Sequence, residues 1–182
     1  PSHLPMVLLT YKLNTHDIIA QHRRCQTTTI QLCDRLQNGT HVELKKALPS
    51  VDIVQVIHVA GPESLDQARA IAPQVDALLL DSGNPADKQK TLGGTGRTHD
   101  WHISARICRE IDKPVFLAGG LHPQNVAEAV RTVRPFGVDV CSGLRTIGQL
   151  DEKLLAAFFE SRAKFSHGLT LRSRNWQITK AK

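Results

Sequence analysis

A carboxyl group at the end of a predicted buried strand is the first candidate for chemistry in this chain. The mostly apolar run from Val75 to Leu80 is followed directly by Asp81 and Ser82, and then by a glycine-rich segment. In parallel α/β folds, side chains at the carboxyl ends of strands and in the loops after them face the ligand, because helices cover the rest of the sheet. We therefore interpret Asp81 as an active-site residue. The alternative is a structural carboxylate that accepts hydrogen bonds from nearby backbone N–H groups.

Three predicted strands are each followed by a loop that contains glycine. The loops read Leu92-Gly-Gly-Thr-Gly, Leu117-Ala-Gly-Gly-Leu and Cys141-Ser-Gly-Leu. Glycine lets backbone N–H groups converge on an anion without a side chain in the way, and a following helix N-terminus adds a favourable dipole. A single loop of this kind is more often a plain turn, but three at equivalent places favour a phosphate ligand.

Strand-like and helical patterns alternate along most of the chain, which is typical of βα units around a parallel sheet. The helices are expected at 14–24, at 40–48, from residue 62, around 103–111, at 124–133 and at 151–159. Trp101 should pack its helix onto the sheet. The six predicted strands lie at residues 7–10, 28–32, 53–59, 77–80, 114–118 and 138–141.

The composition indicates one soluble, cytoplasmic domain with a basic tail. No apolar run in the 182 residues approaches the roughly 20 that span a bilayer. The four cysteines are too scattered for a zinc site and do not resemble a disulfide scaffold, so we expect reduced thiols and no metal. The net charge of +6 comes from residues 161–182: removing their six basic residues from 23 Lys and Arg leaves 17, equal to the 17 Asp and Glu. This tail has few aromatic residues, which argues against nucleic-acid binding.

Four linked motifs resemble the phosphoribosylanthranilate isomerase family. The resemblance covers residues 7–159 and is most specific in the second half of the chain. The motifs are Asp81-Ser, Gly93-Gly-Thr-Gly followed by Asp100-Trp, Leu117-Ala-Gly-Gly-Leu with Pro123 and Asn125-Val, and Gly137-Val-Asp-Val-Cys-Ser-Gly.

The resemblance implies an eight-stranded β/α (TIM-type) barrel with a sugar-phosphate substrate and no cofactor. The family converts N-(5-phosphoribosyl)anthranilate to a 1-deoxyribulose 5-phosphate in tryptophan biosynthesis, an Amadori rearrangement of the aldose–ketose type. Its chemistry needs an acid at the ring oxygen and a base at the sugar C2 proton. The resemblance makes Asp81 the acid.

The resemblance also assigns the substrate-binding residues. Gly94 and Gly96 would shape the loop after Asp81. Asp139 would face the ligand, although a solvent-facing aspartate at a strand end is the alternative. The backbone donors for the phosphate would be Gly119, Gly120, Ser142 and Gly143.

The chain departs from the family at its start and after one strand. The family's first two βα units have no counterpart here, and with them a Lys-Ile-Cys-Gly strand that carries the basic cysteine and an arginine for the anthranilate carboxylate. We therefore divide the chain into a barrel with six of eight βα units at 1–164 and a basic extension at 165–182. The family's Gln-Leu-His-Gly is Gln31-Leu-Cys-Asp here. Cys33 is thus either a replacement base or a small buried hydrophobe.

Two features leave alternatives open. An open sheet would expose its edge strands, which the tail, a second copy of the chain or a missing N-terminal portion would have to cover. The missing base suggests a second function, a non-catalytic relative that binds a phosphate ligand. Other phosphate-binding barrel lyases and synthases usually carry a catalytic lysine at a strand end, and no predicted strand ends in one.

Overall fold

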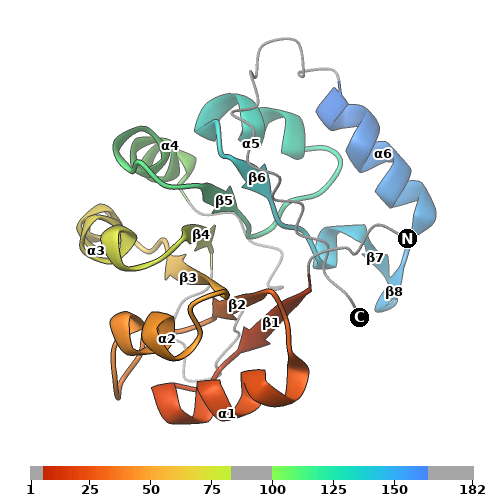
Figure 1. Ribbon diagram of the computed structural model, residues 1–182. Helices are drawn as coiled ribbons and strands as arrows, with labels where there is room; N and C mark the ends of the chain where they lie inside the picture. The colour runs from red at the N-terminus through yellow and green to blue at the C-terminus, as the bar shows by residue number, and fades with distance from the viewer. Residues whose placement is uncertain (1–5, 83–99, 164–182) are drawn as a thin grey trace.

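Six parallel strands form one sheet in the computed structural model, which describes residues 6–82 and 100–163. The strands follow one another across the sheet in chain order (Figure 1). All neighbouring pairs are parallel, which confirms the predicted succession of βα units. The strands are β1 Val7–Thr10, β2 Thr29–Leu32, β3 Asp52–His58, β4 Ala77–Asp81, β5 Val115–Leu117 and β6 Gly137–Val138.

The helices lie along the outer side of this curved sheet (Figure 1). Asn14, Thr40 and Asp100 cap three of them, because their side chains accept hydrogen bonds from first-turn N–H groups. These polar caps determine where the three helices begin. The helices are α1 Thr15–Cys25, α2 His41–Ala47, α3 Glu63–Ile71 with the 3-10 turn η1 Ala72–Gln74, α4 Trp101–Glu110, α5 Val126–Val133 and α6 Glu152–Ala163.

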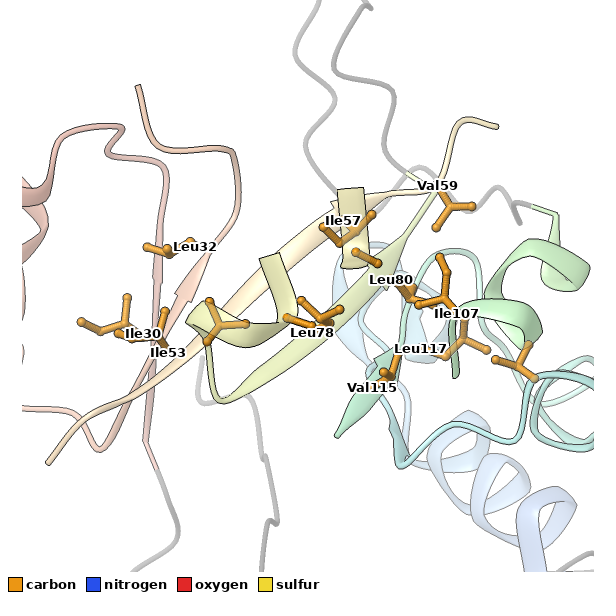
Figure 2. Packing of buried hydrophobic residues seen from close by; sticks show 14 of the residues in the cluster. Ile30, Leu32, Ile53, Ile57, Val59, Leu78, Leu80, Ile107, Val115 and Leu117 are labelled. Carbon is orange, nitrogen blue, oxygen red and sulfur yellow. The ribbon is translucent and has the colours of Figure 1, made fainter. Parts of the chain in front are cut away.

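Alternate strand residues face opposite sides of the sheet. The larger apolar cluster fills the space between sheet and helices, and Figure 2 shows Ile57 of β3, Leu80 of β4 and Ile107 of α4 within it. Trp101 packs against the same cluster, as predicted. We call the opposite side of the sheet the inner face. It carries a smaller cluster of Val54, Val56, Ala77, Leu79, Phe116 and Ala118.

The sixth strand is shorter than predicted. It ends at Val138 instead of residue 141, because its partner β5 already ends at Leu117 and the last ladder bond joins the Asp139 N–H to the Leu117 carbonyl at 2.8 Å. The chain then forms a 3-10 turn and an antiparallel hairpin that the sequence pattern did not predict. These elements are η2 Ser142–Leu144, β7 Arg145–Thr146 and β8 Gln149–Leu150.

Strands β1 and β6 are the edges of the sheet. Within residues 6–82 and 100–163, each of them pairs with one neighbouring strand. The described sheet is therefore open and has six of the eight strands that close a barrel of this type.

None of the described helices combines the length and apolar character that a membrane crossing requires. The predicted extension at 165–182 lies outside the described residues.

Candidate active site

The predicted site residues that the structure describes lie at the carboxyl end of the sheet. Asp81 is the last residue of β4, and its register partner is His58, the last residue of β3. The next two strands continue this row, because the Ala118 N–H donates to the Leu80 carbonyl at 2.7 Å and Asp139 follows β6 at the same level. Neighbouring strands lie about 4.8 Å apart, so Asp81 and Asp139 are about 10 Å from each other along this edge.

The Asp81 carboxylate is half-buried and held from one side. Its Oδ1 accepts a hydrogen bond from the Ser82 N–H at 2.8 Å. This local contact is the one expected of a structural strand-end carboxylate. It also fixes the side chain so that the second oxygen, Oδ2, is left for another group, and the described residues supply no hydrogen bond to it.

Gly119 lies directly against Asp81. Its φ of +84° belongs to the left-handed region that favours glycine. A Cβ atom at this position would lie 2.9 Å from Asp81 Oδ1 and 2.6 Å from Ser82 Oγ, which is closer than real Cβ atoms approach other atoms. The backbone after β5 can therefore reach the carboxylate only because residue 119 has no side chain.

The Asn125 side chain holds the loop that follows Gly119. Its Nδ2 donates to the Gly120 carbonyl at 2.9 Å, and its Oδ1 accepts from the His122 N–H at 2.8 Å. Gly120 also has a positive φ of 61°. The loop is thus tied back onto the start of α5, the helix whose positive N-terminal dipole the phosphate prediction requires.

The turn after β6 packs onto the turn after β5. A Cβ atom on Gly143 would overlap the Leu121 carbonyl oxygen and would lie 3.0 Å from the His122 Cβ. Ser142 and Gly143 form the short turn η2 at this contact. The two glycine turns predicted to share one ligand are therefore in contact, and the first of them touches Asp81.

Cys33 directly follows β2 and is 6% exposed. Its N–H donates to the Thr10 carbonyl at 3.0 Å, so pairing with β1 continues through this residue. Its thiol donates to the Gln31 carbonyl at 3.8 Å and accepts from the Gln31 side-chain amide at 3.9 Å. The burial agrees with the interpretation of a small buried residue, and the role as base stays a prediction.

Two further predicted residues lie outside the described part of the chain, and one lies at the edge of the row. Gly94 and Gly96 belong to residues 83–99, which the structure does not describe. Asp139 is half-buried at the end of β6, so both of its predicted orientations stay open.

Sequence reasoning missed His58. Its Nε2 lies 3.0 Å from the Cys33 carbonyl oxygen, and its Nδ1 is buried without a hydrogen-bond partner in the described part of the chain. The strand prediction ran one residue too far, to Val59. An end at His58 puts this histidine in the row of strand ends, and the two-residue alternation through Val54 and Val56 puts it on the inner face.

The amino end of the sheet carries a structural ion pair. Lys45 Nζ lies 2.7 Å from Asp76 Oδ2, and the same oxygen accepts from the Ile53 N–H at 2.7 Å. Burial and the nearby Asp76 carboxylate raise the pKa of Asp52, while Lys45 opposes this shift.

On helix α4, burial raises the pKa of the Cys108 thiol to about 12. In residues 6–82 and 100–163, no cluster of three or more His, Cys, Asp or Glu side chains could hold a metal ion.

Comparison with known proteins identifies one family. A family model described as N-(5'phosphoribosyl)anthranilate (PRA) isomerase matches residues 8–161. N-(5'-phosphoribosyl)anthranilate isomerase 2 of Methanosarcina mazei is 35% identical over 164 residues, which are 90% of this chain and 72% of that protein.

Solved structures share the fold. The phosphoribosyl anthranilate isomerase of Thermococcus kodakaraensis is 29% identical and superposes with a TM-score of 0.66, covering 87% of this chain and 74% of that one. A second isomerase structure, in complex with reduced 1-(o-carboxyphenylamino)-1-deoxyribulose 5-phosphate, has a TM-score of 0.67 at 23% identity and covers 90% of this chain and 74% of that one.

Proposed function

Since this chain belongs to the N-(5'-phosphoribosyl)anthranilate isomerase family, we propose that it catalyses the rearrangement of N-(5-phosphoribosyl)anthranilate to the corresponding 1-deoxyribulose 5-phosphate. The observation that supports this most is the contact of Gly119 with the Asp81 carboxylate. It joins a proton-transfer group to a glycine turn that leads into a helix N-terminus. A substrate that carries both a phosphate and a reactive sugar ring needs an anion-binding turn and a proton-transfer group close enough for one substrate molecule to reach both.

In this proposal the phosphate binds at the two glycine turns. The N–H groups of Gly119 and Gly120 come from the turn that precedes α5, and those of Ser142 and Gly143 come from the turn η2 packed against it. Backbone N–H groups at a helix start favour a dianion both by hydrogen bonding and through the dipole.

Asp81 acts as the general acid. Because Oδ1 is occupied by the Ser82 N–H, the proton resides on Oδ2. It passes to the ring oxygen of the substrate as the bond between that oxygen and C1 breaks, and the anthranilate nitrogen lone pair forms a Schiff base. A base then removes the C2 proton, the C–H electrons form a C1–C2 double bond, and the nitrogen becomes neutral.

Cys33 is the candidate for this base among the sequence-derived residues. It stands where the family usually has a ligand-facing histidine, at the end of the strand that precedes β3. Replacement by serine tests the assignment: Cys33→Ser should lower kcat while the affinity for a product analogue stays the same. An unchanged kcat would remove Cys33 from the mechanism.

Turnover of N-(5-phosphoribosyl)anthranilate is the direct test of the whole proposal. The substrate's fluorescence should disappear at a rate proportional to protein concentration, and Asp81→Asn should abolish most of that rate.

A second function, binding without turnover, would give a calorimetric signal with the reduced product analogue but no loss of fluorescence. Cys33 in place of the histidine is the observation that keeps this second function in consideration.

A further inference from the structure

His58 occupies a position in the row of strand ends that no predicted function uses. It ends β3, and the two-residue alternation that puts Val54 and Val56 in the inner-face cluster continues to it. Ile57, the residue before it, belongs instead to the cluster under the helices (Figure 2). Its register partner is Asp81. The histidine is therefore beside the proposed acid, on the same face of the sheet.

One ring nitrogen of His58 is committed to the protein. Nε2 lies 3.0 Å from the Cys33 carbonyl oxygen. A carbonyl oxygen only accepts hydrogen bonds, so Nε2 must carry the hydrogen of this contact. In the neutral ring the lone pair then lies on Nδ1. The contact with Cys33 fixes both the orientation and the tautomer of the ring.

The other ring nitrogen has no partner among residues 6–82 and 100–163. Nδ1 is buried, and no group in these ranges forms a hydrogen bond with it. A buried acceptor without a partner is destabilising and usually indicates an absent water, ion or ligand. Two other buried nitrogens are unpartnered among the described residues, Nδ1 of His22 on α1 and Nε1 of Trp101 on α4. His58 alone among the three ends a strand of the sheet, next to Asp81.

The order of groups along the sheet edge suggests what Nδ1 binds. The phosphate turns follow β5 and β6, Asp81 ends β4, and His58 ends β3 on the far side of Asp81 from those turns. A sugar phosphate held at the turns by its C5 phosphate, with its ring oxygen at Asp81, would place C2 and the C2 hydroxyl on the side of Asp81 nearer to His58. That hydroxyl can donate to the Nδ1 lone pair.

We propose that His58 is a further substrate-binding residue, whose Nδ1 accepts a hydrogen bond from a hydroxyl of the sugar phosphate. This inference rests on the proposed function, because the direction of the ligand is set by the phosphate turns and Asp81. It adds a specificity element: a phosphate ester without a hydroxyl at that place would bind the turns but leave Nδ1 unsatisfied.

Two substitutions separate the two ring nitrogens. Asparagine is short and places its amide near Nδ1, whereas glutamine is longer and places its amide near Nε2. His58→Asn should keep the affinity for the reduced product analogue within about threefold of wild type, although losing the Cys33 contact lowers its Tm. His58→Gln should keep the Tm but raise Kd and KM about tenfold, equivalent to one hydrogen bond. His102→Gln, on the exposed start of α4, is the matched control. It should change neither the Tm nor the affinity for the analogue.

Binding of inorganic phosphate separates the contribution of the phosphate group from that of the sugar hydroxyl. It should bind wild type and His58→Gln equally, since it carries no carbon-bound hydroxyl. The inference is overturned if His58→Gln binds the analogue as tightly as wild type, or if His58→Asn loses as much affinity as His58→Gln.

A measurement on the unmodified protein removes any dependence on how the variants fold. In long-range 1H–15N spectra, the Nδ1 resonance of His58 should shift when the analogue is added, while Nε2 keeps its protonated position. The inference is overturned if the protein turns over substrate but the Nδ1 resonance of His58 does not move when the protein is saturated with the analogue. Wild type that neither binds the analogue nor turns over substrate would instead overturn the proposed function itself.

Discussion

Gly119 approaches the Asp81 carboxylate so closely that a Cβ atom on it would lie 2.9 Å from Oδ1. The glycine turn after β5 and the proposed acid are therefore built as one unit, through two adjacent parallel strands. A side chain added at Gly119 should therefore displace the Asp81 carboxylate.

Removing the proton of Asp81 should abolish catalysis and leave ligand binding in place. Asp81→Asn keeps the size of the side chain and the acceptor for the Ser82 N–H, but it cannot donate an acidic proton. We expect kcat to fall about 10²–10⁴-fold, with the Kd of the reduced product analogue nearly unchanged. Asp112→Asn, on an exposed residue before β5, is the control, and an equal loss of kcat in both variants would contradict the role of Asp81.

A methyl group on Gly119 should damage both stability and phosphate affinity. Gly148 supplies a matched control, since its φ of +75° is similar but no atom lies within 4 Å of a Cβ placed there. Gly148→Ala should cost only the conformational term of about 1–2 kcal/mol. Gly119→Ala adds the clash with Asp81 and Ser82, so its cost measured by urea unfolding should be larger, about 2–4 kcal/mol. Equal costs would show that the close approach has no consequence.

The stability of the protein should depend on Asp52 in a predictable direction. Burial and Asp76 raise the pKa of this carboxyl above its ordinary value of 3.8, so the folded chain holds its proton more tightly than the unfolded chain. The free energy of unfolding contributed by Asp52 therefore falls as pH rises from 3.8 through the raised pKa. Asp52→Asn should give a small rise in Tm at pH 7 and none well below pH 3.8. A lower Tm at pH 7 would contradict this sign.

The cysteines should differ in reactivity. Cys25 and Cys141 are exposed, whereas burial raises the pKa of Cys108 to about 12. At about pH 8 the Cys108 thiolate fraction is then on the order of 10⁻⁴. Iodoacetamide followed by peptide mass spectrometry should find Cys25 and Cys141 modified well before Cys108. Urea-unfolded protein is the control, in which this difference should vanish.

The sequence predicted the elements whose signals are local. The start of the first helix near Asn14 and the buried strand before Asp81 depend on neighbouring residues, and both lie where expected. The predicted end of β6 was wrong because the true end depends on where the partner strand β5 ends. His58 was missed because the importance of its Nδ1 depends on a contact of Nε2 with a carbonyl 25 residues away. Pairing partners and side-chain contacts of this range leave no local pattern.

The location of a bound product analogue tests the central claim most directly. A crystal structure of this protein with reduced 1-(o-carboxyphenylamino)-1-deoxyribulose 5-phosphate should show the phosphate on the N–H groups of Gly119, Gly120, Ser142 and Gly143. The sugar should lie within hydrogen-bond distance of Asp81 Oδ2. Phosphate density away from these two turns, or a sugar out of reach of Asp81, would contradict the account.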